Sequence, residues 1–247
     1  MKNLKIKKII AVMTALTSMM ILAACGSSDV DSTASNQSDS NVEVTESETA
    51  IEEDKTNQEE SQISTDVSME GLLSHAETPA EDFTYYISND IVIIDGYIGT
   101  DSIVVIPESI EGYPVKSIIN IKGKGIQAIK FSDSMEAISE SLFLLDEDIQ
   151  YVVFGANVKI VGKEAFYICP NMKEIQLNDS LEVIEQAALA TNSKVLTDLY
   201  IPESVTEINA GLSAYEYTLT HVKAGSYAEE YCKYVKEGND DFVYVVE

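Results

Sequence analysis

Pairs of apolar residues recur along this chain, from residue 104 onward, at intervals of about 23 residues. The two residues of a pair flank one other residue, and successive pairs lie 25, 23, 23, 24 and 23 residues apart. The pairs are Val104/Ile106, Ile129/Phe131, Val152/Phe154, Ile175/Leu177, Leu199/Ile201 and Val222/Ala224. A fixed period of this length is typical of repeat proteins, in which each unit stacks on the next. The period therefore predicts a repeat solenoid.

A second track of apolar pairs keeps the same phase, as Met135/Ile138, Val158/Val161, Leu181/Ile184 and Val205/Ile208. Alternation such as Ile129-Lys130-Phe131 has the period of a half-buried strand whose middle residue points outward. We expect a mainly β solenoid with short turn or helical segments. Phe143, Phe166 and Leu189 follow the second track at a constant distance and are predicted core residues.

Different patterns flank the repeats and predict caps for the two ends of the stack, so that a repeat domain spans residues 79–247. At the N-terminal end, 83–87 and 90–94 predict two strands joined at Ser88-Asn89. At the C-terminal end, Ser226-Tyr-Ala-Glu229 has the form of a helix capping box, and 242–246 predicts a final strand.

The first 24 residues have the features of an export signal. Four lysines precede an apolar stretch from Ile9 to Leu22 that is short for a membrane-spanning helix. The stretch ends in Leu22-Ala-Ala-Cys25-Gly, which is similar to a bacterial lipobox. We expect a diacylglycerol anchor on Cys25 and a location on the outer face of the cytoplasmic membrane, exposed to the cell wall or cell surface. An ordinary cleavage site with an incidental cysteine is the alternative.

Residues 25–78 differ in composition from the repeats. Between Gly26 and Thr78 there is no aromatic residue, and 14 acidic residues accompany the single Lys55. Such a segment buries too little apolar surface to offset its ordering entropy. We expect a disordered tether that carries the domain away from the membrane.

The charge of the chain narrows the choice of partners. Removal of residues 1–24 takes away four lysines and no acid, so 12 basic residues would face 42 acidic ones, a net charge of −30. This charge repels nucleic acid and the bare anionic membrane surface. The need for solubility at the cell surface explains this large negative charge.

Candidates for catalysis are few. Cys169 and Cys232 lie too far apart along the stack for a disulfide and are predicted to be buried thiols. His75 falls in the tether and His221 on the last repeat strand, each without a partner that spacing identifies. The acidic run 146–148 lacks the spacing of a calcium loop and predicts a solvated turn. We therefore expect no enzymatic activity, no metal site and no bound cofactor.

The outward positions of the repeat strands should form one surface. The positions are Ala128, Lys130, Tyr151, Val153, Glu174, Gln176, Asp198, Tyr200, His221 and Lys223. We select Lys130, Tyr151, Val153, Gln176, Tyr200 and Lys223 as a candidate binding face, with Tyr151, Val153 and Tyr200 as exposed anchors. The alternative is that these residues only cover the sheet, together with a neighbouring loop.

Four units resemble the BspA-like, or Treponema-type, leucine-rich repeats of bacterial surface proteins. They are Ile126 to Phe143, Ile149 to Phe166, Met172 to Leu189 and Leu196 to Leu212. Ile106 to Ile118 is similar to the family's first repeat and Gly225 to Tyr231 to its last. An insert at 122–125 and Leu212 in place of an aromatic residue depart from the pattern. The resemblance implies a right-handed solenoid with a parallel sheet, surface display, and binding of protein or matrix as in adhesins.

The expected function is therefore that of a surface lipoprotein whose repeats bind a protein or glycan. One alternative is a structural, envelope-organising protein with no host ligand. A more distant one is a solute-binding lipoprotein, although such proteins use two hinged domains around a cleft.

Overall fold

The computed structural model describes residues 67–212 and 217–247. The predicted signal peptide, Cys25 and the tether up to residue 66 lie outside the described residues. No described helix is long and apolar enough to cross a membrane.

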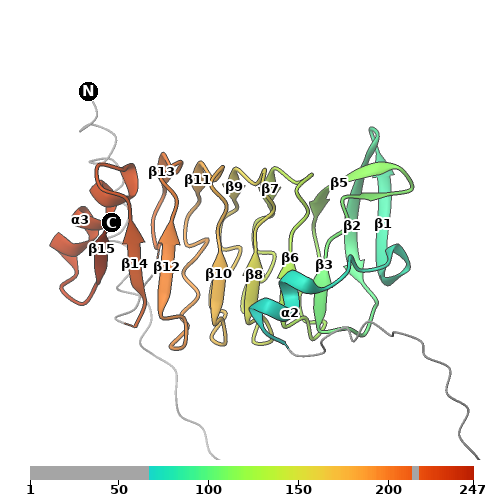
Figure 1. Cartoon of the computed structure of the whole chain (residues 1–247), viewed down its shortest axis with the longest axis horizontal. Helices are drawn as coiled ribbons and strands as arrows, with labels where there is room; N and C mark the ends of the chain where they lie inside the picture. Colours follow the sequence, from blue (N-terminus) through green and yellow to red (C-terminus); the bar gives the residue numbers. More distant parts are fainter. Residues whose placement is uncertain (1–66, 213–216) are drawn as a thin grey trace, which may run out of the picture. The chain divides into compact units, whose positions relative to one another are not determined.

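The strands of the first apolar track form parallel sheets on one side of the solenoid (Figure 1). The order of the first sheet is β10-β8-β6-β3, made of β3 (Ile103–Val105), β6 (Ala128–Lys130), β8 (Tyr151–Val153) and β10 (Glu174–Gln176). The next sheet has the order β12-β14-β15, made of β12 (Asp198–Ile201), β14 (Leu219–Val222) and β15 (Tyr244–Val246). The predicted solenoid and its strands are confirmed.

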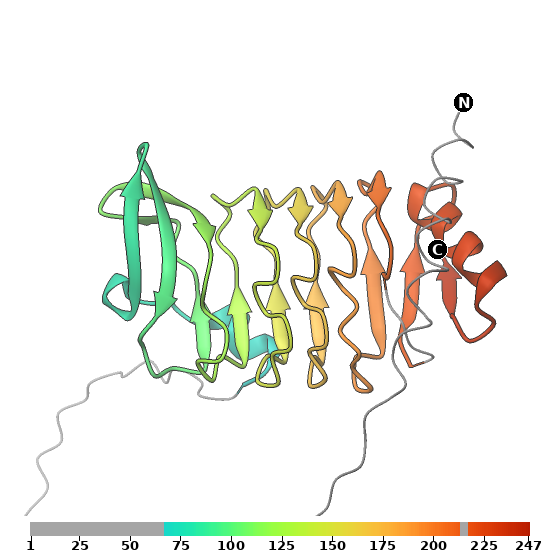
Figure 2. The same cartoon turned by 180° about the vertical axis from the view of Figure 1, so that it is seen from behind.

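The second apolar track forms another parallel sheet, seen along the upper edge in Figure 2. Its order is β13-β11-β9-β7, made of β7 (Ala137–Ile138), β9 (Ile160–Val161), β11 (Val183–Ile184) and β13 (Glu207–Ile208). The sequence analysis did not predict this sheet, because two-residue strands are too short for an alternation pattern.

The core lies inside the turns of the solenoid, where the two tracks meet. Phe143 and Phe166 are fully buried, and their rings stack with centroids 5.7 Å apart. Leu189 is 1% exposed, so the three predicted core positions are confirmed. The last apolar pair departs from the pattern, because Ala224 lies beyond β14 and is exposed.

Adjacent turns approach so closely that some positions admit only glycine. A Cβ atom on Gly155 would lie 2.1 Å from the backbone oxygen of Ser132 in the preceding turn. Such a contact cannot be relieved by a side-chain rotation, because the oxygen belongs to the backbone.

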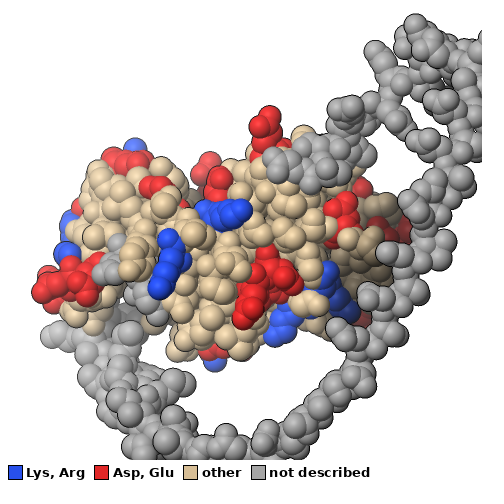
Figure 3. Space-filling model, turned by 90° about the horizontal axis from the view of Figure 1, so that it is seen from below, with Lys and Arg blue, Asp and Glu red and all other residues tan. Residues whose placement is uncertain are grey.

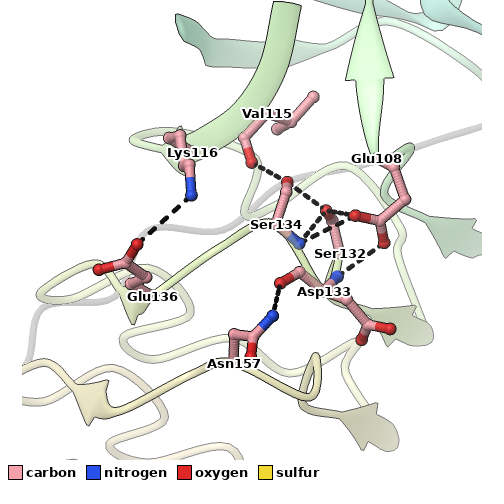
Figure 4. A network of polar contacts seen from close by, with 8 residues as sticks. All are labelled: Glu108, Val115, Lys116, Ser132, Asp133, Ser134, Glu136 and Asn157. Carbon is pink, nitrogen blue, oxygen red and sulfur yellow. Dashed lines mark hydrogen bonds and ion pairs between the residues drawn. The ribbon is translucent and has the colours of Figure 1, made fainter.

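A polar network around Glu108 joins the first turns (Figure 4). The Glu108 carboxylate accepts hydrogen bonds from the backbone N–H groups of Asp133 (2.7 Å) and Ser134 (2.9 Å) and from the Ser132 hydroxyl (3.0 Å). The Ser134 hydroxyl donates to the Val115 carbonyl. These bonds satisfy backbone groups of the turn after β6, as expected for a structural serine.

The N-terminal cap is a sheet of order β1-β2-β5-β4. It comprises β1 (Phe83–Ser88), β2 (Ile91–Tyr97), β4 (Ser109–Ile110) and β5 (Tyr113–Ile118), preceded by the 3₁₀ helix η1 (Ala80–Asp82). β1 and β2 are antiparallel, and the turn between them places Asn89 and Asp90 at positive φ. The predicted hairpin is confirmed.

The C-terminal cap begins with α3 (Tyr227–Gly238). The Ser226 hydroxyl accepts from the N–H of Glu229, and the Glu229 carboxylate accepts from the N–H of Gly225, so the predicted capping box is present. Cys232 on this helix and Cys169 are both free and buried, as predicted. Burial raises the pKa of each thiol to about 12, which leaves neither as a reactive thiolate at neutral pH.

The domain begins earlier than the predicted boundary at residue 79. Residues 69–74 form the helix α2 (Met69–Ser74), and Leu72 within it has no exposed surface. The sequence analysis assigned these residues to the tether because their composition is polar. Leu72, Met69 and Val67 pack on the repeat domain and Thr78 bonds to Val105, and composition does not reveal these contacts.

Candidate binding face

α2 lies across the outward face of the first sheet (Figure 1). Leu72 packs into a cluster with Ile103, Val105, Ala128 and Val153, which come from β3, β6 and β8. Val67, Met69 and Tyr151 border the same cluster. The N-terminal half of the predicted face is therefore covered by a segment of the chain itself.

The segment after α2 is fixed to the edge of β3. Thr78 donates its N–H to the Val105 carbonyl, and its hydroxyl accepts from the Val105 N–H, both at 2.9 Å. His75, predicted in the tether, lies 3.3 Å from the Asp101 carboxylate and is largely buried. These contacts set the register at which α2 reaches the sheet.

The six selected residues differ in exposure. Val153 is only 8% exposed, Tyr151 is half-buried beside α2, and Lys130 and Gln176 are half-buried. Tyr200 and Lys223 are exposed, Tyr200 to 56%. Of the three proposed anchors, only Tyr200 is therefore open. Val153 is not available as an anchor in this structure because α2 covers it.

The uncovered part of the face lies on the second sheet, and we call it the open face. Tyr200, His221 and Val245 stand side by side on β12, β14 and β15, because these three positions pair in register. Tyr200 and Val245 are exposed. The open face is thus a row of one aromatic ring, one imidazole and one aliphatic side chain at the C-terminal end of the stack.

His221 joins the three strands of the open face. Its Nε2 lies 2.8 Å from Asp198 Oδ1, and its Nδ1 lies 2.9 Å from Glu247 Oε1. The Tyr200 ring stacks on the imidazole with centroids 4.0 Å apart. Both ring nitrogens face carboxylates, and only the protonated ring can donate to both. Spacing could have revealed Asp198, which stands 23 residues, one repeat, before His221.

The charges around His221 favour its protonated form. Burial lowers the pKa of the ring, but the hydrogen bonds to Asp198 and Glu247 and their negative charges outweigh burial, so the pKa lies above its ordinary value. The hydrogen bond from His221, with a second from Thr197, lowers the pKa of the Asp198 carboxyl.

A hollow of about 560 Å³ adjoins the open face, between β10 and β12. It is lined by polar and apolar residues: Lys173, Glu174, Ile175, Gln176, Leu177, Thr197, Asp198 and Tyr200. Its size is within the range of small-molecule sites. The sequence analysis placed Glu174, Gln176, Asp198 and Tyr200 on one surface but gave no sign of a hollow between them.

The other polar clusters make contacts that stabilise the fold. A smaller hollow is lined by Lys116 and Lys159, which form ion pairs with Glu136, inside the hollow, and with Glu182, outside it. The Asp146 carboxylate accepts from three backbone N–H groups, which is the role of a structural turn. Among the described residues, no group of three or more His, Cys, Asp or Glu side chains could hold a metal ion. Lysines on the side shown in Figure 3 are scattered among acidic side chains and form no basic patch there.

Comparison with known families identifies the repeats. Residues 121–235 match the profile of the BspA type leucine rich repeat region in six copies. The matched repeats are therefore similar to those of the BspA type. The match covers slightly less than half of the chain. No curated protein matches the sequence significantly.

Several solved leucine-rich repeat structures align with the chain, and the first of them, with a TM-score above 0.5, has a similar fold. A leucine-rich repeat protein of Treponema pallidum aligns with a TM-score of 0.51 at 24% identity, over 60% of this chain and 72% of the other. One from Bacteroides ovatus aligns with a TM-score of 0.45 at 22% identity, over 58% of this chain and 39% of the other. A leucine rich cell surface protein of Faecalibacterium prausnitzii aligns with a TM-score of 0.32 at 16% identity, over 60% and 55% of the two chains.

The substitution Leu72→Asp is expected to release α2 from the sheet. Loss of a buried leucine costs about 2–5 kcal/mol, and a helix of six residues has little stability of its own. Hydrogen exchange should then show loss of protection in residues 67–78 while the repeat strands stay protected. Leu73→Asp is the matched control, because Leu73 is 51% exposed. Equal protection in both variants would contradict the assigned contact.

His221 is expected to make stability depend on pH near neutrality. Because its pKa is higher in the folded chain, its stabilisation is present below about pH 6.5 and is lost as pH rises through the folded pKa. The melting temperature should therefore fall as the pH rises above about 6.5 and through the pKa of His221 in the folded chain. The pH-dependent fall in melting temperature should vanish in His221→Gln, whereas His75→Gln should retain it. A parallel decline in both variants would exclude His221 as its source.

Proposed function

We propose that this protein is a lipid-anchored surface lipoprotein whose leucine-rich repeat domain binds a protein of the host matrix or of the cell's own wall. The observation that carries the proposal is the open face. Tyr200 is exposed on a rigid sheet, and tyrosine is among the common anchors of protein interfaces. Val245, on the far side of His221, adds exposed apolar surface. Leu219 lies in the same sheet, half-buried, and extends the apolar surface beside Asp198.

The charge pattern supports a protein partner with basic groups. Asp198 and Glu247 border the open face, and acidic residues far outnumber lysines in the chain. Charges at the rim of an interface mainly accelerate association and exclude partners of like charge. A partner surface with lysine or arginine around an apolar centre would fit this arrangement.

The lipid anchor is proposed from the sequence. The lipobox-like residues before Cys25 and the acidic segment after it support attachment through diacylglycerol and a long tether. Two or three acyl chains would give stable attachment, since each buried methylene contributes about 0.8 kcal/mol.

Cys25→Ser is expected to abolish lipid attachment while the repeat domain still folds. Cells that express the full chain would be labelled with palmitate and separated into membrane and soluble fractions. We expect label and membrane association for the natural chain and neither for the variant. Substitution of Ser27, two residues further on, should change neither result. Undiminished label on the Cys25→Ser chain would refute the anchor.

The open face is tested with the double substitution Tyr200→Ser and Val245→Ser. The chain from residue 25, with Cys25→Ser, would be applied to immobilised fibronectin, laminin and collagen and to isolated cell walls. We expect binding to at least one surface and a loss of about tenfold or more in the double variant. Tyr234→Ser on α3, where the tyrosine is 38% exposed, is the control.

Circular dichroism and melting must first show that each variant is folded. Binding to cell walls but not to matrix proteins would favour the structural, envelope-organising role. Binding that does not respond to the double substitution would remove the open face from the proposal.

A further inference from the structure

The hollow between β10 and β12 exists because the strand ladder is interrupted there. In successive turns, backbone N–H groups donate to the carbonyl of the turn before, at 2.8 Å each: Gln127 to Ser102, Gln150 to Gln127 and Lys173 to Gln150. The next bond of this kind runs from the Leu219 N–H to the Thr197 carbonyl. Between these steps, β10 ends one sheet and β12 begins another, with no pairing between them in the described chain.

The interruption is confined to one side of the stack. On the other side β11 and β13 pair in parallel, and Thr206 N–H donates to the Glu182 carbonyl at 2.9 Å. The two turns are therefore held together at one edge and open at the other. The hollow belongs to the folded structure and does not require the repeats to separate.

The loop before β12 is longer by one residue than those of the two turns before it. The step from Ile175 to Leu199 is 24 residues, whereas the two steps before it are 23 each. Ser193 fixes this loop, since its hydroxyl donates to the Met172 carbonyl at 2.6 Å and accepts from Val195 and Leu196.

The lining offers both donors and acceptors at short range. Glu174 Oε1 accepts from the Gln176 amide at 2.9 Å, which leaves Glu174 Oε2 and the Gln176 oxygen as further acceptors. Lys173 also lines the hollow, and its Nζ lies 5.4 Å from the centre of the Tyr151 ring on β8, in a cation–π contact. Tyr200 adds an exposed aromatic ring on the opposite wall, and His221 covers only one face of it.

We propose that this hollow binds a neutral oligosaccharide. Sugar hydroxyls both donate and accept hydrogen bonds, which matches carboxylates, an amide and an ammonium group that line a single space. The C–H face of a pyranose ring can pack on the Tyr200 ring. The lining is mixed, with Ile175 and Leu177 beside the polar residues, and an amphipathic sugar ring matches it better than a purely apolar ligand, which favours sites lined mainly by apolar side chains. The excess of acidic residues disfavours polyanionic glycans.

The sugar site goes beyond the proposed protein contact and uses different residues. Val245 belongs only to the open face, whereas Glu174 and Gln176 belong only to the hollow. Tyr200 is common to both and is therefore not used to separate them.

The test is isothermal titration of the chain from residue 25, carrying Cys25→Ser, with chitotriose, maltotriose, cellotriose and mannotriose, and with a heparin tetrasaccharide. We expect at least one neutral trisaccharide to bind at millimolar concentration or below. Glu174→Ala and Gln176→Ala should each weaken that binding about tenfold. Glu207→Ala on β13, an exposed glutamate of the other sheet, and Val245→Ser should leave it unchanged.

Three outcomes would overturn the proposal: no neutral trisaccharide binds, only the heparin fragment binds, or binding persists in both Glu174→Ala and Gln176→Ala. Attachment to matrix or wall proteins that survives these two substitutions would leave the proposed function intact. Sugar binding that survives Val245→Ser, without any attachment to proteins, would support the hollow alone.

Discussion

Each repeat of this protein can bury its apolar residues only against the repeats on either side. A single unit contributes a three- or four-residue strand, a two-residue strand and a few apolar side chains, which is too little for a core of its own. The stack therefore depends on the ladder of backbone hydrogen bonds that keeps adjacent units at one spacing. Phe143 can stack on Phe166 only because this spacing is maintained. Gly155 shows how narrow the tolerance is, since even a Cβ atom would collide with the preceding turn.

Where that ladder is interrupted, the structure gains a feature that a regular solenoid lacks. One additional residue before β12 is accommodated without loss of the second sheet, so β11 and β13 stay paired. The two turns then diverge at one edge only. Polar side chains that would point into solvent from a continuous sheet instead face each other across a hollow. The interruption thus leaves a hollow at the surface without disrupting the core.

Much of this arrangement could be predicted from the sequence. The first apolar track located the strands of one side, the second located core positions but not its own short strands, and the capping box at Ser226 located α3. The N-terminal hairpin was recognised from its turn and alternation. Buried thiols at Cys169 and Cys232 followed from the repeat spacing. These features depend on residues close in sequence or related by the period. The position of α2 could not be predicted, because Leu72 is one leucine in a polar segment and its partners lie about 30 to 80 residues away.

The candidate binding face also combines features that the sequence predicts with features that only the tertiary structure determines. The sequence by itself determined which residues point outward on each strand, because side chains alternate along a strand whatever surrounds it. Only the tertiary structure decided which of them meet solvent. Val153 is covered by a helix from outside the repeats, Tyr200 is left open, and His221 is placed between two carboxylates from different strands. The period is a local property of the chain, whereas exposure depends on contacts between segments far apart in sequence, which no pattern in either segment records.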